Sequence, residues 1–155
     1  DASGTRYTPP PSTVAGLVRN MHRDFPHYTT AFYNLTEKIL RAAKPGEINT
    51  DVQAAFYDGG EAVVPDFGSP VQIAHEVGHA MYAKIDRDAW VKALRQVRDL
   101  GEARDYPLAK RIADAVDERG FNANEWYAFM FSFAGGDLSE VPERLRPFFL
   151  PYGSQ

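Results

Sequence analysis

Residues 68–82 read GSPVQIAHEVGHAMY and open with a strong helix start signal. Ser69 can serve as the N-cap, and Pro70 occupies the first helical position, where a proline costs no hydrogen bond. Gln72 stands at the third helical position, which completes a capping box with Ser69. These signals predict a helix from Pro70 to about Ile85.

Two histidines with a glutamate between them lie within this predicted helix. His75 and His79 are four positions apart, so their imidazoles share one face, about 6 Å apart along the axis. Both can reach a single tetrahedral zinc ion with bonds of about 2.0–2.1 Å. Glu76 is rotated by about 100° from His75, which suits a general base better than a third ligand. Because HExxH rarely arises by chance, we interpret the pattern as a zinc site rather than as core histidines.

Gly78 precedes the second histidine of the motif. A glycine inside a helix costs about 1 kcal/mol relative to alanine. We therefore expect another backbone to approach the helix closely at this position.

The bulk composition is that of a globular domain. The chain has 155 residues, of which 44% are hydrophobic and 25% charged, and its net charge is −4. We expect one domain over residues 12–155, preceded by an extended, proline-rich lead-in over residues 1–11. The acidic balance argues against nucleic-acid and membrane partners, and cysteine is absent. Since the chain starts without Met, we expect a mature or excised domain that is secreted or extracytoplasmic and acts as a monomer.

The remaining pattern predicts an α+β fold in which helices dominate. Two short apolar runs within residues 52–66 flank Asp58-Gly59-Gly60 and predict a β-hairpin, with Pro65 indicating an edge strand. Further helices are predicted over residues 12–25, 30–44, 88–100, 107–119 and 123–134, with a shorter one over 142–149.

A catalytic zinc ion needs a third protein ligand and keeps one position open for water. Without cysteine, an acidic residue or another histidine must supply it. A metzincin site would need glycine and histidine where this chain has Tyr82 and Ile85.

Glu125 is the best candidate for this third ligand because it lies in the first turn of a later helix. The competing interpretation is that Glu125 completes a capping box with Asn122, which would tie its carboxylate to the backbone. Four alternative ligands remain open: Glu102, Asp137, His22 and His27.

Two motifs together resemble the gluzincin metallopeptidases, which use two histidines and a glutamate. The sequence IAHEVGHAMY and the later NEWYA, residues 124–128, are most similar to the catalytic domains of the anthrax lethal factor and pro-pro endopeptidase family. The segment 142–149 is similar to the terminal helix of that group. The resemblance covers about residues 52–150.

The resemblance implies a zincin-like domain that cleaves peptides or proteins with one zinc ion. It implies that His75, His79 and Glu125 bind zinc and that Glu76 is the general base. It also implies that an extended substrate pairs with the strand at residues 61–66. Two other functions remain open: a zinc hydrolase of a non-peptide amide, and a zinc-holding domain without catalysis.

The chain departs from this family at two positions. The family carries a tyrosine about two turns before its glutamate ligand, to stabilise the oxyanion, and residues 113–124 contain none. Tyr106 and Tyr127 are the nearest candidates. The family also tends to carry a second glutamate one turn after the ligand, where this chain has Phe129. Most aromatic residues of the 123–134 helix are expected in the core, with one or two lining a hydrophobic pocket.

Overall fold

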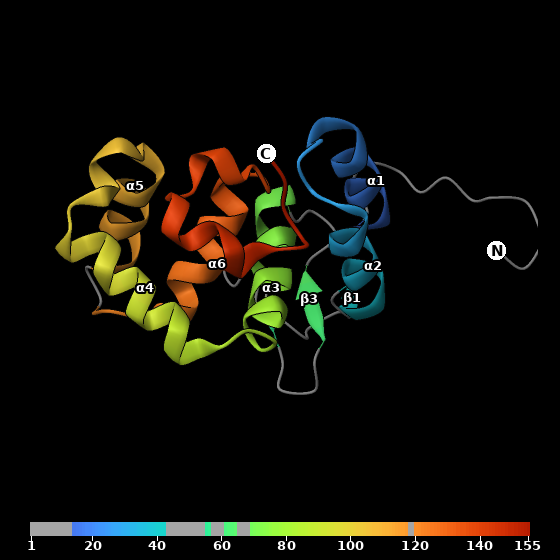
Figure 1. The fold of residues 1–155 in the computed structure, drawn as a ribbon. Helices are drawn as coiled ribbons and strands as arrows, with labels where there is room; N and C mark the ends of the chain where they lie inside the picture. Colours follow the sequence, from blue (N-terminus) through green and yellow to red (C-terminus); the bar gives the residue numbers. More distant parts are fainter. Residues whose placement is uncertain (1–13, 43–54, 57–60, 65–68, 118–119) are drawn as a thin grey trace, which may run out of the picture.

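The computed structural model describes residues 14–42, 55–56, 61–64, 69–117 and 120–155. The predicted lead-in lies outside these residues. The fold is α+β with helices dominant, and helix α3 (Pro70–Tyr82), which carries the histidine motif, lies near its centre (Figure 1). On one side of α3 lie a small sheet, α1 (Val14–Asp24) and α2 (Thr30–Ile39); on the other lie α6 (Ala123–Phe133), α4 (Arg87–Asp99) and α5 (Pro107–Val116).

Helix α3 begins where the sequence predicts. The Ser69 hydroxyl accepts a hydrogen bond from the Gln72 amide at 3.3 Å, and the Gln72 side chain accepts one from the Ser69 amide at 2.8 Å. This reciprocal pair is the predicted capping box, followed by Pro70 at the first helical position. The helix ends at Tyr82, short of the predicted Ile85.

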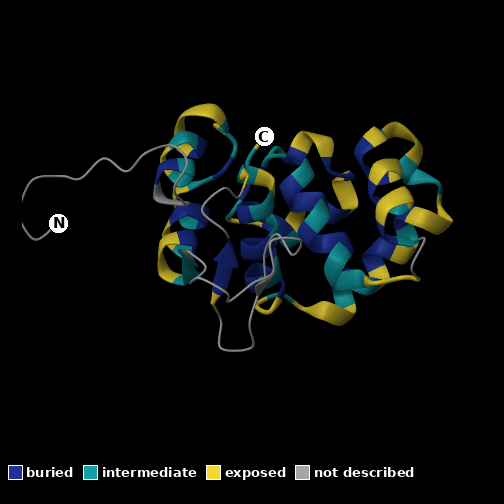
Figure 2. Cartoon of the chain, turned by 180° about the vertical axis from the view of Figure 1, so that it is seen from behind, coloured by how far each residue is buried: buried dark blue, intermediate teal, exposed yellow. Residues whose placement is uncertain are grey.

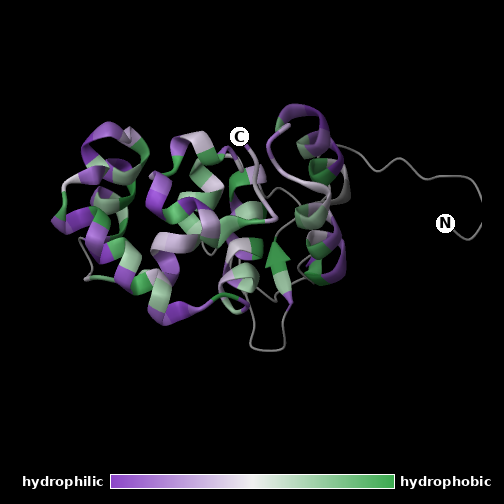
Figure 3. Ribbon diagram, viewed as in Figure 1, coloured by the Kyte–Doolittle hydropathy of each residue, from purple (hydrophilic) through white to green (hydrophobic). Residues whose placement is uncertain are grey.

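Helix α3 is buried on nearly all sides. It contacts the sheet, α1, α2 and α6, and its buried residues include the apolar Ile73, Val77 and Met81. Figures 2 and 3 show the same arrangement: buried, hydrophobic residues gather on the inner elements, and exposed, hydrophilic ones on the outer faces of the flanking helices. A helix enclosed in this way holds its polar side chains in a low-dielectric surrounding, where the electrostatic interactions among the motif residues are stronger than in water.

The prediction of a close backbone approach at Gly78 is confirmed. A Cβ atom at this position would lie 3.1 Å from the Cα atom of Ala128 and 3.4 Å from its Cβ atom. Since Ala128 belongs to α6, glycine on one helix and alanine on the other set the spacing between α3 and α6.

Replacing Gly78 by valine is expected to lower the free energy of unfolding by about 1–3 kcal/mol, because the added methyl groups have no space at this crossing. Urea denaturation measures the loss. Ala83→Val, at the exposed end of the same helix, is the control and should change stability by less than about 0.5 kcal/mol. Equal stability of the two variants would contradict the close packing of α3 on α6.

The sheet has three strands: β1 (Leu40–Ala42), β2 (Ala55–Phe56) and β3 (Ala62–Val64). Strands β2 and β3 are antiparallel, which confirms the predicted hairpin, although its turn residues and Pro65 lie outside the described residues. Strand β3 is central, with β1 parallel on its other side. The prediction that it is an edge strand is therefore wrong. Because both edges of Ala62 and Val63 are already paired, a substrate strand cannot add at these residues either.

The helix predicted over residues 30–44 is also shorter than expected. It ends at Ile39, and Leu40 is extended, with φ −82° and ψ 134°. Leu40 then pairs with Ala62 in the parallel ladder. No glycine or proline stands at this point of the sequence, so the strand is determined by its distant partner rather than by a local stop signal.

The other predicted helices are observed as α1, α4, α5 and α6, with ends that differ by a few residues from those predicted. A short 3₁₀ helix, η1 (Glu102–Asp105), lies between α4 and α5, and another, η3 (Leu138–Glu140), follows α6. The predicted last helix is also of the 3₁₀ type, η4 (Glu143–Phe149). Within the described ranges, no helix has the length and apolar character needed to cross a membrane.

Candidate metal centre

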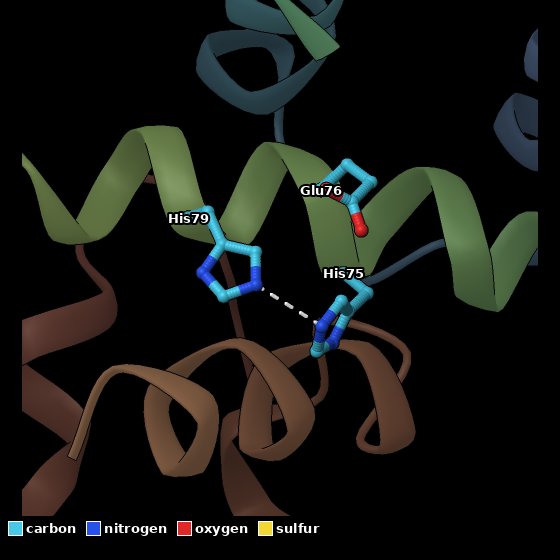
Figure 4. A group of neighbouring side chains, drawn as sticks. All are labelled: His75, Glu76 and His79. Atoms are coloured by element: carbon cyan, nitrogen blue, oxygen red, sulfur yellow. Dashed lines mark hydrogen bonds between the residues drawn. The ribbon is translucent and has the colours of Figure 1, made fainter. Parts of the chain in front are cut away.

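Three side chains from two helices meet beside α3. The Nε2 atoms of His75 and His79 lie 3.1 Å apart, and both imidazoles project from the same side of α3 (Figure 4). From α6, the Glu125 carboxylate places one oxygen 2.9 Å from His79 Nε2 and the other 3.6 Å from His75 Nε2. The structure thus brings the two histidines of the motif together with the acidic residue predicted as third ligand.

These distances fit a tetrahedral metal ion. With bonds of about 2.0–2.1 Å, neighbouring ligand atoms of tetrahedral zinc lie about 3.3 Å apart. The two imidazole nitrogens lie 3.1 Å apart, and each lies 2.9 or 3.6 Å from a different oxygen of Glu125, so the observed separations scatter around that value. Two neutral imidazoles and one carboxylate also form a donor set typical of catalytic zinc.

Capping of α6 does not tie up the carboxylate of Glu125. The Asn122 side chain accepts a hydrogen bond from the Glu125 backbone amide at 3.0 Å and so caps α6. The Glu125 carboxylate does not complete a capping box; it faces the histidines instead. The cap uses the backbone amide of Glu125 and the histidines contact its carboxylate, so the two interactions involve different groups of one residue.

Asn124 is a supporting residue that the sequence did not single out. Its Oδ1 atom lies 2.7 Å from His79 Nδ1, on the opposite side of that ring from Glu125. With Nδ1–H donating to Asn124, the lone pair of Nε2 is free to point into the site. Its position directly before Glu125 was the only available signal, because the contact depends on how α6 packs on α3.

Replacing Asn124 by alanine is expected to weaken metal affinity by about 10–100-fold, because His79 loses the partner that fixes its tautomer. Competition with a chromophoric chelator measures the dissociation constant. Asn122→Ala is a matched control two positions away. It should cost about 1 kcal/mol of stability through the lost cap and leave affinity within tenfold. Equal affinities of the two variants would contradict the role of Asn124.

His75 differs from His79 in its surroundings. Its Nδ1 atom is buried and has no hydrogen-bond partner within the described part of the chain. Phe129, one turn after Glu125, packs against the ring instead, with 4.3 Å between ring centroids. The Nδ1 atom of His79 is therefore hydrogen-bonded to Asn124, whereas the side of His75 away from Nε2 is held by an aromatic contact.

Glu76 lies on the side of α3 beside the two imidazoles (Figure 4) and is only 6% exposed. Its carboxylate and the two imidazoles offer ligand atoms within 4.8 Å of one another. Burial raises the pKa of Glu76, against the opposing effect of the nearby histidines. A buried carboxylate within reach of the histidine pair is suited to proton transfer there.

The pKa values of the candidate ligand residues reflect their contacts. The neighbouring imidazoles of His75 and His79 hold the pKa of Glu125 far below its usual range, because they stabilise the ionised carboxylate. Burial lowers the pKa of His79, but hydrogen bonds with Glu125 and Asn124 outweigh it and the net shift is upward. The carboxylate is therefore ionised and available as a ligand across the neutral pH range.

The alternative ligands have other partners. Glu102 pairs with Arg144 at 2.6 Å. Asp137 accepts hydrogen bonds from Ser139 and lies 3.6 Å from His27. His22 stacks on Tyr33, with ring centroids 3.5 Å apart. None of these four groups contacts the motif histidines.

The two tyrosines considered for the oxyanion role also face elsewhere. The Tyr127 hydroxyl donates to the Phe148 carbonyl at 2.7 Å, and its ring is fully buried. The Tyr106 hydroxyl lies 3.4 Å from a guanidinium nitrogen of Arg146. Both hydroxyls thus make contacts within the fold rather than facing the motif histidines.

A pocket of about 610 Å³ opens beside Glu125, between the end of α5 and α6. Its lining includes Val116, Phe121 and Phe129. The side chain of Glu125 is 34% exposed, whereas those of His75 and His79 are 14% and 13% exposed, so the candidate ligand set is most accessible on the Glu125 side.

Comparisons with known proteins do not assign the chain to a family. No family model matches it, and neither a curated protein nor a solved structure shows significant similarity to it.

Proposed function

We propose that the chain is a zinc-dependent endopeptidase of the gluzincin type. The observation that carries this proposal is the convergence of His75 and His79 from α3 with Glu125 from α6. The resemblance of HEVGHA and NEWYA to the lethal factor and pro-pro endopeptidase family supports the same conclusion. In this reading the two histidines and Glu125 hold one zinc ion, and a peptide or protein is the substrate.

The residues divide the chemistry between them. A bound zinc ion supplies a Lewis acid, which lowers the pKa of water and polarises a carbonyl. His75, His79 and Glu125 would hold the ion in place, and Asn124 fixes the tautomer of His79. Glu76 takes the proton from the attacking water and delivers it to the amine that leaves when the peptide bond breaks.

A digest of a proteome-derived peptide library, read by mass spectrometry, tests the proposal. Zinc-loaded protein is expected to cut at a defined set of sites, protein stripped with a chelator to cut none, and zinc-restored protein to cut the same set. A His75→Ala, His79→Ala double variant, purified in parallel, reports contaminating proteases. The proposal fails if the zinc-loaded protein cuts nothing, or if the double variant produces the same cuts.

One observation favours a second candidate, a zinc hydrolase of a non-peptide amide. Strand β3 has β1 and β2 on its two edges and so offers no edge for an extended peptide. No peptide cuts, together with amine release from a panel of small N-acyl compounds, would favour this function. A zinc-holding domain without catalysis would give neither product.

The proposal includes action outside the cytoplasm, since a chain without cysteine is compatible with an oxidising compartment. Fractionation of the source cells, with an antibody against the chain, tests this location. Recovery of the protein in the cytoplasmic fraction would contradict it.

A further inference from the structure

Phe129 takes part in two features of the candidate site. Its ring packs against His75 at 4.3 Å between centroids, with the planes inclined by 46°. The same side chain lines the pocket beside Glu125. A single residue therefore connects the surroundings of a metal ligand with the space next to the metal.

The contact with His75 has an energetic consequence. Metal-ligating histidines almost always donate their second ring N–H to a carbonyl or carboxylate, and loss of such a partner costs about 10–100-fold in metal affinity. In the described part of the chain, the buried Nδ1 of His75 has no such partner, although His79 has Asn124. An aromatic ring orients the imidazole by packing but accepts no comparable hydrogen bond.

The pocket on the other side of Phe129 suits an apolar side chain. Val116, Phe121 and Phe129 provide apolar walls, and a volume of about 610 Å³ accommodates an aromatic or branched side chain. Among its described lining residues, Glu125 alone can carry a charge, and this carboxylate is directed at the histidines. One nearby cation, the guanidinium of Arg98, lies over the Phe121 ring at 5.3 Å from its centroid. It is paired with the Asp117 carboxylate at 3.5 Å, so its charge is partly balanced outside the pocket.

We infer that Phe129 favours substrate selection at the expense of metal affinity: it forms a wall of a pocket for an apolar substrate side chain, and its place beside the His75 ring leaves the Nδ1 atom of that ring without a hydrogen-bond acceptor. The substrate half of this inference rests on the proposed peptidase function. The metal half does not, because it concerns only the affinity of the ligand set. The two halves predict changes of opposite sign when Phe129 becomes acidic.

Phe129→Glu is expected to tighten zinc binding by about 10–100-fold, measured by competition with a chromophoric chelator. A carboxylate at this position can accept the Nδ1–H of His75, so NMR of protein labelled with ¹⁵N-histidine should show that proton in slower exchange than in the wild type. Phe133→Glu, one turn further along α6 on a residue that touches Phe129, is the matched control and should leave both readouts unchanged. Unchanged affinity in Phe129→Glu, or equal gains in both variants, would overturn the metal half.

The substrate half is read from the cleavage sites of the same variants. Wild-type protein should favour sites with an aromatic or branched apolar residue at one position next to the cut, and Phe129→Glu should lose at least about tenfold of this preference. Phe129→Leu keeps an apolar wall and offers His75 no acceptor, so it should retain an apolar preference and wild-type zinc affinity. A preference that is identical in all three proteins would overturn the pocket assignment.

Binding provides a readout that does not require cleavage. N-acetylphenylalanine amide should shift NMR signals of residues around the pocket in wild type and less in Phe129→Glu, whereas N-acetylaspartate amide should shift none. If no peptide is cut but these shifts appear, the proposed function fails and the pocket stands. If peptides are cut and the shifts are absent, the function stands and the pocket assignment fails.

Discussion

Glu76→Gln is expected to lower the rate of peptide cleavage by about 10²–10⁴-fold, the usual contribution of a general base. Glutamine has nearly the same shape as glutamate but cannot take a proton from water. Because Glu76 is not one of the three converging ligands, the variant should bind zinc with wild-type affinity. The expected result is therefore a folded, metal-loaded and nearly inactive protein.

The measurement combines zinc content with initial rates on a peptide found in the library digest. Glu102→Gln is the matched control, since Glu102 is paired with Arg144 on the surface and contacts no motif histidine. It should retain wild-type rates. A Glu76→Gln protein that still cleaves at the wild-type rate would refute the assigned role of Glu76. Wild type and variant that are equally inactive, with zinc bound, would favour the zinc-holding domain.

Among the single substitutions, Glu125→Ala is expected to produce the largest loss of metal affinity. Removing a ligand should weaken zinc binding by more than the 10–100-fold typical of outer-shell partners. The change also leaves the His75 and His79 pair without the carboxylate that now lies 2.9 Å from His79. Zinc content after dialysis against a weak chelator, together with the dissociation constant from competition, measures the effect.

Asp137→Ala provides a control for Glu125→Ala, because Asp137 was an alternative ligand and lies instead against Ser139 and His27. It should leave zinc binding unchanged. If Glu125→Ala kept its zinc and Asp137→Ala lost it, the third ligand would have to be reassigned. Loss of zinc in both variants would require a check of folding by circular dichroism before any assignment.

Local signals predicted some elements accurately. The start of α3 depends on Ser69, Pro70 and Gln72, all within one turn, and the structure has the predicted capping box. The strand Leu40–Ala42 was missed for the opposite reason, since its partner Ala62–Val64 is distant in sequence. Residues 39–42 contain no glycine or proline that would predict the end of the helix there.

The candidate site shows the same division. Two histidines four positions apart predict their own geometry because a helix fixes it. Glu125 could be ranked among the acids by chemistry, but only the packing of α6 on α3 brings its carboxylate within 2.9 Å of His79. The contacts of Asn124 with His79 and of Phe129 with His75 depend on the same packing, so their positions beside Glu125 in the sequence were not enough to assign their roles.

The close approach of Gly78 and Ala128 also links metal binding with folding. The proposed ligands come from the two helices that this contact holds together, so a bound ion would join α3 to α6 at a second point. An ion that binds only the folded chain stabilises it by about 2.7 kcal/mol when its free concentration is 100 times the dissociation constant. Zinc should therefore raise the melting temperature of Gly78→Val as well as that of the wild type. Because Gly78 has no side chain, α3 and α6 can lie close enough for their residues to share one ion. The spacing of these two helices therefore helps to determine how much the stability of the fold rises with the zinc concentration.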